Sequence, residues 1–219
     1  MLKVACVYKS GAEYTPEDVR KLTEAVAANL AIPHETVCIT DDEQGVMPYV
    51  DHTVSILHDL PYWWPKLQMF NLSGPVLYFD LDTVILHSID HPANCVRTLQ
   101  DNLMVLADFY HPELIASGIM GWAGSMQLIW DKFEQQVTGP GRFHEKRNGV
   151  SFQVGNELYR GDQDWLRVWL PRLGIKTVMA QSMDPGICSF KVHCRNRGIP
   201  AGTNIVCFHG RPKPAEVGL

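Results

Sequence analysis

Two aspartates stand one residue apart at the end of an apolar run in the segment GPVLYFDLDTVI, residues 74–85. Because side chains i and i+2 of an extended chain point the same way, Asp80 and Asp82 can present carboxylate oxygens to one divalent cation. A Mg²⁺ or Mn²⁺ ion held in this way suits the binding of a diphosphate. In the alternative interpretation the pair only ends a strand and caps a turn. The spacing does not separate the two, because so short a motif also occurs by chance.

The segments before these aspartates alternate between strand and helix. The run LKVACVY, residues 2–8, predicts a strand, and residues 15–30 predict a helix with Thr15 as N-cap, Pro16 at the first helical position and Asp18 at the capping-box position. Apolar residues at helical spacing give this helix one face that packs on a sheet: Val19, Leu22, Val26 and Leu30.

Further strands are predicted at residues 35–40, 54–60 and 76–79, the last a continuous apolar run typical of a strand buried on both faces. The alternation indicates an α/β fold, and we expect one domain over residues 1–219. In such sheets ligands bind beyond the carboxyl ends of the strands. Both aspartates lie at such an end.

The composition is ordinary, with 46% hydrophobic and 20% charged residues and a net charge of −5. It implies no general attraction to nucleic acid or acidic membranes, so an anionic ligand needs a local basic site. The amino-terminal run MLKVACVY is too short for a signal peptide, and the uncharged run at residues 114–130 is interrupted by glycine and polar residues. We therefore expect a cytoplasmic protein with no membrane span. The six cysteines show no CxxC spacing, and we expect reduced thiols.

The letters DLDTVI also fit the opening motif of haloacid-dehalogenase-like phosphatases, in which the first aspartate is a nucleophile. A phosphatase of that type would carry the motif near the start of its fold and a later acidic pair. Here a strand-helix-strand unit precedes the motif, and GDQDWL, residues 161–166, has a different acidic spacing. The sequence disfavours this interpretation.

Six segments in order resemble a group of bacterial and phage glycosyltransferases related to glycosyltransferase family 8: VYKSGAEYTPEDV, PYWWPKLQMF, GPVLYFDLDTVI, ASGIMGW, GDQDWL and CFHGRPKP. The resemblance covers nearly the whole chain. It implies a GT-A fold, a Rossmann-like domain with a mixed, mostly parallel central sheet flanked by helices.

In family 8 enzymes the paired aspartates and a carboxy-terminal histidine bind Mn²⁺, which clamps the donor diphosphate. The resemblance places these roles on Asp80, Asp82 and His209, with Mg²⁺ as the other candidate ion. The chemistry suits the set, since Mn²⁺ accepts imidazole as well as carboxylate ligands. A histidine satisfied in the core is the alternative for His209.

The resemblance assigns three further positions to the donor phosphates. Lys213 is similar to the family lysine that contacts phosphate, and Gly210 allows close approach of the backbone. The family pattern has more residues between histidine and glycine, and Arg211 is the alternative phosphate cation. Lys66 resembles a basic residue that reaches donor phosphate or sugar. In the alternative interpretation Lys66 is a surface lysine on a helix. The neighbouring Trp64 is expected to face solvent or the acceptor.

The resemblance also assigns residues to the rest of the donor. Tyr8, Lys9 and Tyr14 follow the first strand, where a GT-A fold receives the base and ribose, although Tyr14 also suits packing on the following helix. In ASGIMGW, Ser117 and Gly118 correspond to small residues that lie against the donor sugar. The alternative is an ordinary glycine-containing strand and bend.

GDQDWL is the predicted place of the sugar chemistry. By resemblance to retaining enzymes, Asp162 binds sugar hydroxyls and Gln163 lies near the anomeric carbon, while Asp164 caps the following helix. An inverting enzyme would need a carboxylate as general base, and Asp164 is then the candidate.

We therefore expect a metal-dependent glycosyltransferase that moves a hexose from a nucleotide diphosphate sugar, a UDP-sugar by resemblance, to an acceptor hydroxyl, with retention. A nucleotidyltransferase and a noncatalytic nucleotide-sugar-binding module stay open as alternatives. The polar segment 138–150 is interpreted as a mobile lid on the acceptor side.

Overall fold

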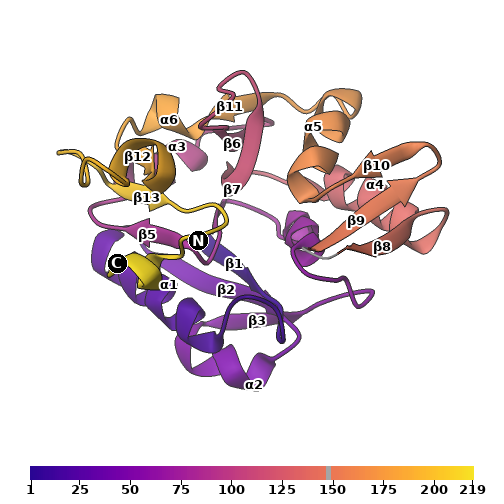
Figure 1. The fold of residues 1–219 in the computed structure, drawn as a ribbon, viewed down its shortest axis with the longest axis horizontal. Coiled ribbons are helices and arrows are strands. Elements are labelled where there is room, and N and C mark those ends of the chain that lie inside the picture. Colours follow the sequence, from indigo (N-terminus) through magenta and orange to yellow (C-terminus); the bar gives the residue numbers. More distant parts are fainter. Residues whose placement is uncertain (147–148) are drawn as a thin grey trace.

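The structure, a computed structural model, describes residues 1–146 and 149–219. A seven-stranded sheet runs through its centre in the order β11-β6-β7-β4-β1-β2-β3 (Figure 1). Its strands are β1 (Leu2–Tyr8), β2 (His34–Thr40), β3 (His52–Ser55), β4 (Val76–Phe79), β6 (Leu103–Ala107), β7 (Ile115–Trp122) and β11 (Thr177–Met179).

Most strands of this sheet are parallel. β1 pairs in parallel with both β2 and β4, with Ala5 beside Val37 on one side and Tyr78 on the other. β2 pairs in parallel with β3, and β6 with β11. β7 alone among the described strands of this sheet runs the other way, antiparallel to β4 and β6. The expectation of an α/β fold with a mixed, mostly parallel sheet is confirmed.

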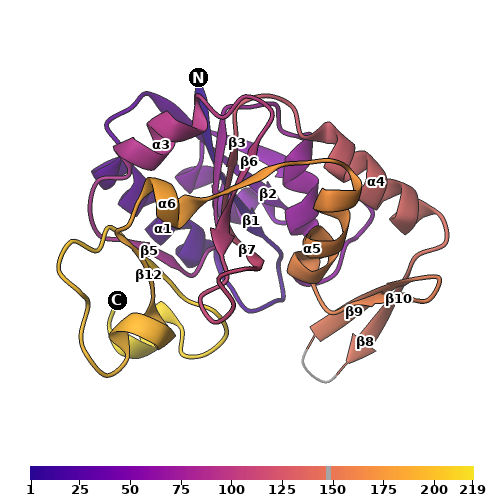
Figure 2. The same ribbon diagram turned by 90° about the horizontal axis from the view of Figure 1, so that it is seen from above.

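Helices cover both faces of the sheet (Figure 2). One face packs against α1 (Pro16–Asn29), α3 (Asp90–Val96) and α6 (Ala180–Met183), with α2 (Glu43–Val46) and the 3₁₀ turn η1 (Met47–Tyr49) at its edge. The other packs against the 3₁₀ helix η2 (Trp64–Asn71), α4 (Gln127–Thr138) and α5 (Asp162–Arg172). The sheet is therefore buried on both sides, as its apolar central strands require.

The first helix begins as the sequence predicts. Pro16 is its first residue, and the backbone N–H of Thr15 donates to the Asp18 carboxylate at 2.8 Å, which is half of the capping box. Val19, Leu22 and Val26 are buried against the sheet. These predictions are confirmed.

Trp64 lies in the core rather than facing solvent or an acceptor. Its side chain is fully buried, its Nε1 donates to the carbonyl oxygen of Val150 at 3.0 Å, and its ring stacks on Phe133 at 5.7 Å. The expectation for Trp64 is therefore wrong. The 3₁₀ helix η2 packs against the sheet and α4, and this packing places the side chain of Trp64 in the core.

A small antiparallel sheet follows α4. It contains β8 (Arg142–Lys146), β9 (Gly149–Val154) and β10 (Glu157–Tyr159) in the order β10-β9-β8. The segment 138–150 was expected to be a mobile polar lid, whereas most of its described residues belong to this hairpin. Arg147 and Asn148, which the same expectation included, lie outside the described residues. The role as a lid stays a prediction.

A third sheet joins the carboxy-terminal part of the chain to the paired aspartates. Its strands are β12 (Ile187–Ser189), β13 (Ile205–Cys207) and β5 (Thr83–Ile85), in the order β12-β13-β5. After β13 the chain continues to the 3₁₀ turn η4 (Pro214–Val217). β5 begins directly after Asp82, and Thr83 pairs with Cys207. The residues after β13 are thereby brought beside the aspartates.

All six cysteines are free thiols, and five of them are buried; Cys95 is half-buried.

Among residues 1–146 and 149–219, no helix has both the length and the apolar character needed to cross a membrane.

Gly121 of β7 provides a test of the packing between the sheet and α3. A Cβ atom at this position would stand 2.5 Å from a methyl group of Val96 and 3.0 Å from the end of Met104. We expect Gly121→Ala to lower the free energy of unfolding by about 2 kcal/mol, because the core has no room for the methyl group. Gly124→Ala is the matched control, since a Cβ there meets nothing within 4 Å. Urea denaturation measures both, and equal losses would contradict the tight packing.

Candidate functional site

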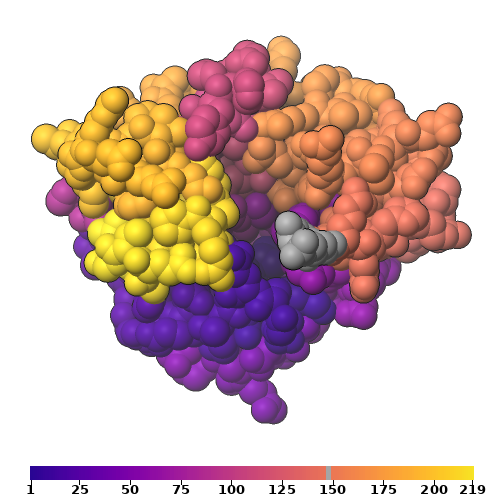
Figure 3. Space-filling model, viewed as in Figure 1, coloured from indigo at the N-terminus to yellow at the C-terminus, as the bar shows by residue number. Residues whose placement is uncertain are grey.

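One cavity of about 690 Å³ opens at the carboxyl ends of β1, β4 and β6. Figure 3 shows this face hollowed between the amino-terminal segment, the segment around α5 and the carboxy-terminal segment. Twelve of the residues predicted from the sequence line the cavity: Lys9, Tyr14, Lys66, Asp80, Asp82, Ser117, Gly118, Asp162, Gln163, His209, Gly210 and Lys213.

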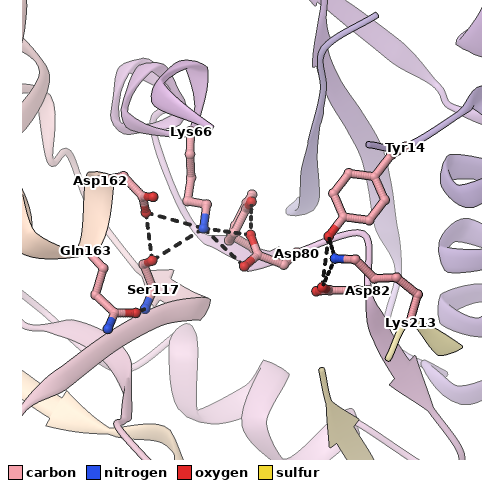
Figure 4. Close-up of polar contacts among 9 residues, drawn as sticks. Tyr14, Lys66, Asp80, Asp82, Ser117, Asp162, Gln163 and Lys213 are labelled. Atoms are coloured by element: carbon pink, nitrogen blue, oxygen red, sulfur yellow. Dashed lines mark hydrogen bonds and ion pairs between the residues drawn. The ribbon is translucent and has the colours of Figure 1, made fainter. Parts of the chain in front are cut away.

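Asp80 and Lys66 form the centre of the site (Figure 4). The ammonium group of Lys66 lies 2.8 Å from one carboxylate oxygen of Asp80 and 3.0 Å from the other. The phenol of Tyr78 donates to the same carboxylate at 2.5 Å. Lys66 is only 8% exposed, so the interpretation as a surface lysine is wrong. The reason is that η2 turns this side chain toward the end of β4.

The same lysine also reaches Asp162, the first residue of α5. The distance from Lys66 Nζ to the Asp162 carboxylate is 3.3 Å, and the hydroxyl of Ser117 donates to that carboxylate at 2.7 Å. Gln163 accepts a hydrogen bond from the backbone N–H of Ser117 at 3.3 Å. GDQDWL and ASGIMGW, which are distant in the sequence, therefore meet around one ammonium group, as Figure 4 shows.

Asp80 carries an unusual pKa. Burial raises the pKa of this carboxyl to about 6, the charge of Lys66 opposes the rise, and the nearby charges of Asp82 and Asp162 add to it. Three carboxylates thus face a small volume, and their repulsion favours the arrival of positive charge. Lys66 and Lys213 supply part of this positive charge.

Asp82 belongs to a second polar cluster on the other side of the cavity. Its carboxylate accepts hydrogen bonds from the Tyr14 phenol and from the Lys213 ammonium, each at 2.8 Å. Lys213 also donates to the Tyr14 oxygen at 2.7 Å and lies 3.1 Å from Glu13. Lys213, near the carboxy terminus, is thereby fixed against residues of the amino-terminal segment, as Figure 4 also shows.

His209 follows β13 and lines the same cavity. Its Nε2 lies 2.8 Å from the Ser189 hydroxyl, and its ring stacks on Phe109 at 6.2 Å. Burial lowers the pKa of His209, and the nearby charge of Lys191 lowers it further. Although the charges of Asp82 and Asp108 oppose this shift, the lowered pKa favours the neutral imidazole, the form that binds metal ions.

Two glycines leave space in the cavity wall. A Cβ atom on Gly118 would lie 3.3 Å from Leu106 and 3.5 Å from the Asp80 carboxylate, so a larger residue would crowd the centre of the site. Gly210 has a φ of +67°, a conformation that favours glycine. Both glycines keep backbone accessible beside charged side chains.

Lys9 lines the cavity but is already engaged. Its ammonium lies 2.8 Å from Asp41 and 3.0 Å from Asp59, and so ties the end of β1 to two neighbouring loops. Contact with a ligand would have to compete with these two ion pairs.

Two predicted residues lie outside the cavity lining. Tyr8 is the last residue of β1 rather than following it, and is buried in the core formed with α1. Asp164 accepts a hydrogen bond from the backbone N–H of Arg160 at 3.2 Å, next to the start of α5. Arg160 precedes Gly161, the N-cap residue of α5, so this hydrogen bond does not cap the helix, and both roles of Asp164 stay predictions.

Asp108 is a site residue that the sequence analysis missed. It lines the cavity directly after β6, where it pairs with Arg167 at 2.7 Å and lies 3.4 Å from the Gln163 amide. Although burial works to raise its pKa, hydrogen bonds from the backbone of Tyr110 and from Arg167 hold the pKa of Asp108 below its usual range. The apolar run LMVLA before Asp108 was the available signal, since it ends at the same sheet edge as β4.

The donor types at the cavity fit a divalent cation, because two carboxylates and a neutral imidazole line one volume. In the described residues, however, no three histidine, cysteine, aspartate or glutamate side chains are grouped so as to hold a metal ion. Asp80 is paired with Lys66, Asp82 with Lys213 and His209 with Ser189. The metal set therefore stays a prediction.

Comparison with protein-family models finds no match to this chain, and comparison with curated proteins finds none either.

Lys66 offers a test of the central cluster. Lys66→Met leaves the carboxylates of Asp80 and Asp162 without their shared cation. We expect the free energy of unfolding at neutral pH to fall by about 3 kcal/mol, because uncompensated buried charge is costly. Urea denaturation of this variant is compared with Lys21→Met, which changes an exposed lysine of α1 and should cost less than about 0.5 kcal/mol. A loss no larger than that of the control would show that the carboxylates do not need the cation.

Proposed function

We propose that the protein is a metal-dependent glycosyltransferase that moves a hexose from a nucleotide diphosphate sugar to an acceptor hydroxyl. One observation carries the proposal: a single cavity collects Asp80, Asp82, His209, Lys213 and Asp162 from separate segments of the chain. The α/β fold with its ligand cavity at the carboxyl ends of parallel strands supports it. The GT-A fold, UDP as the donor nucleotide and retention are parts of this proposal.

The proposed roles follow from the chemistry of each group. When bound, Mn²⁺ or Mg²⁺ held by Asp80, Asp82 and His209 supplies positive charge beside the leaving diphosphate. Lys213, and Lys66 from the other side, add charge-assisted hydrogen bonds to the phosphate oxygens. These contacts stabilise the negative charge that develops as the nucleotide leaves.

The sugar is proposed to lie against Ser117, Gly118, Asp162 and Gln163. Asp162 accepts hydrogen bonds from sugar hydroxyls, while Gly118 leaves space for the ring. The bond between the anomeric carbon and the phosphate oxygen breaks, and the diphosphate keeps the electron pair. The acceptor oxygen bonds to the anomeric carbon and gives up its proton to the departing diphosphate, so that no protein base is required.

The location of Asp164 counts against the inverting base that the sequence suggested, while Asp108 and Asp162 are carboxylates that do line the cavity. An inverting enzyme needs a carboxylate within reach of the acceptor proton. Asp164, the candidate from the sequence, is bonded to the backbone of Arg160 and lies outside the cavity lining. The nucleotidyltransferase alternative requires a basic glycine-rich loop after the first strand, and there Lys9 is held by Asp41 and Asp59.

The test is a panel of UDP-, GDP-, CMP- and dTDP-sugars, each with Mn²⁺ and with a chelator, in which nucleotide release is followed. We expect slow, metal-dependent hydrolysis of one UDP-sugar even without an acceptor, because the roles proposed for the metal ligands and Lys213 stabilise a diphosphate leaving group. Cleavage of phosphate esters alone would favour a phosphatase, and release of pyrophosphate from a nucleoside triphosphate would favour a nucleotidyltransferase. Binding of a donor without turnover would favour a noncatalytic module.

Asp162→Asn tests the sugar position. The amide keeps the shape and the contact with Ser117 but loses the charge, so we expect nucleotide affinity to stay near normal while transfer falls about 100-fold. Calorimetric titration of UDP and a transfer assay measure the two effects. Unchanged transfer would remove GDQDWL from the site. A comparable loss in Asp164→Asn would favour the inverting mechanism.

A further inference from the structure

Lys191 lies on an element that the chain fixes against one wall of the cavity. It is the second residue of the π-helical turn η3 (Phe190–Cys194), which directly follows β12. β12 runs parallel to β13, with Ser189 beside Cys207, and the ring of Phe190 stacks on Phe208 at 4.7 Å. The start of η3 is thus packed on the segment that leads from β13 to His209.

The ammonium of Lys191 lies beside Gly210, a residue of the cavity lining, although Lys191 itself is not part of that lining. A Cβ atom built on Gly210 would come 3.4 Å from Lys191 Nζ, and Gly210 itself lines the cavity. Gly210 has a positive φ, and because it has no side chain its backbone lies close to the lysine. The charge of Lys191 therefore acts on the same volume as His209.

Lys191 differs from the lysines that line the cavity in having no acidic partner among the residues that the structure describes. Each of those has a carboxylate within 3.0 Å: Lys9 has Asp41, Lys66 has Asp80 and Lys213 has Asp82. Arg211, the alternative phosphate cation, pairs with Glu216, and its side chain is 72% exposed. Within residues 1–146 and 149–219, no carboxylate oxygen lies within 4 Å of Lys191 Nζ.

We propose that Lys191 is a phosphate-binding residue, which holds the diphosphate of the donor across Gly210. The inference rests on the proposed function for the identity of the ligand as a nucleoside diphosphate. A phosphate oxygen that reaches Lys191 meets a cation without having to break an existing ion pair, unlike one that reaches Lys66 or Lys213. Lys191 therefore contributes to affinity for the diphosphate rather than for the nucleoside.

The test measures the binding of UDP, uridine and inorganic pyrophosphate by calorimetry in one buffer containing Mg²⁺. In Lys191→Gln we expect affinity for UDP and for pyrophosphate to fall between about 10-fold and 100-fold, the range of a charge-assisted hydrogen bond. Affinity for uridine should stay within about twofold, because uridine has no phosphate. Lys191→Arg should recover most of the lost affinity, since it restores the charge.

Lys21→Gln is the matched control, because it removes the charge of an exposed lysine of α1 that does not line the cavity. UDP affinity in Lys191→Gln within about twofold of wild type, or an equal loss in Lys21→Gln, would overturn the inference while leaving the proposed function in place. Conversely, pyrophosphate binding that depends on Lys191, in a protein that releases no nucleotide from any sugar donor, would keep the anion site and overturn the proposed function. A wild-type protein that binds neither UDP nor pyrophosphate would overturn both.

Discussion

The site depends on neutralising three carboxylates that face one cavity. Asp80, Asp82 and Asp162 lie at the ends of different elements, and desolvating them without cations would cost several kcal/mol each. Two lysines meet this requirement: Lys66 lies between Asp80 and Asp162, while Lys213 binds Asp82. Lys66 is close in sequence to Asp80 but remote from Asp162, and Lys213 is remote from Asp82. The same ion pairs that permit the site therefore also hold together the amino-terminal, central and carboxy-terminal parts of the fold.

Ion pairs of this kind suit a site whose ligand carries both signs of charge. A bound cation can take over carboxylate oxygens, and the lysines so released can turn to phosphate oxygens, with little change in the total charge of the cavity. Under the proposed function, the free protein would hold its charged groups in place through contacts that the donor and its metal replace. Such preorganisation reduces the cost of ordering side chains when the ligand binds.

The sequence predicted the parts of the site that lie next to a recognisable strand or motif. Asp80 and Asp82 follow an apolar run whose β character is plain, and the start of α1 is set by local capping chemistry at Thr15 and Asp18. The burial of Trp64 and the pairing of Lys66 could not be predicted in this way, because they depend on how η2 packs against distant elements. Lys191 gave no local signal at all, since its position is set by the stacking of Phe190 on Phe208.

The one antiparallel strand of the described central sheet explains why small residues reach the charged centre. Strands that run parallel to one another have only their carboxyl ends at the edge of the sheet where the cavity lies. Asp80 follows β4 there, and Asp108 follows β6. β7 runs the other way, so its amino-terminal half, with Ser117 and Gly118, arrives at that same edge. The backbone N–H of Asp80 donates to the Gly118 carbonyl oxygen at 2.9 Å, which fixes the two strands in register there. Reversal of a single strand thus places a hydroxyl and an open backbone position directly beside a carboxylate, which parallel neighbours would not do.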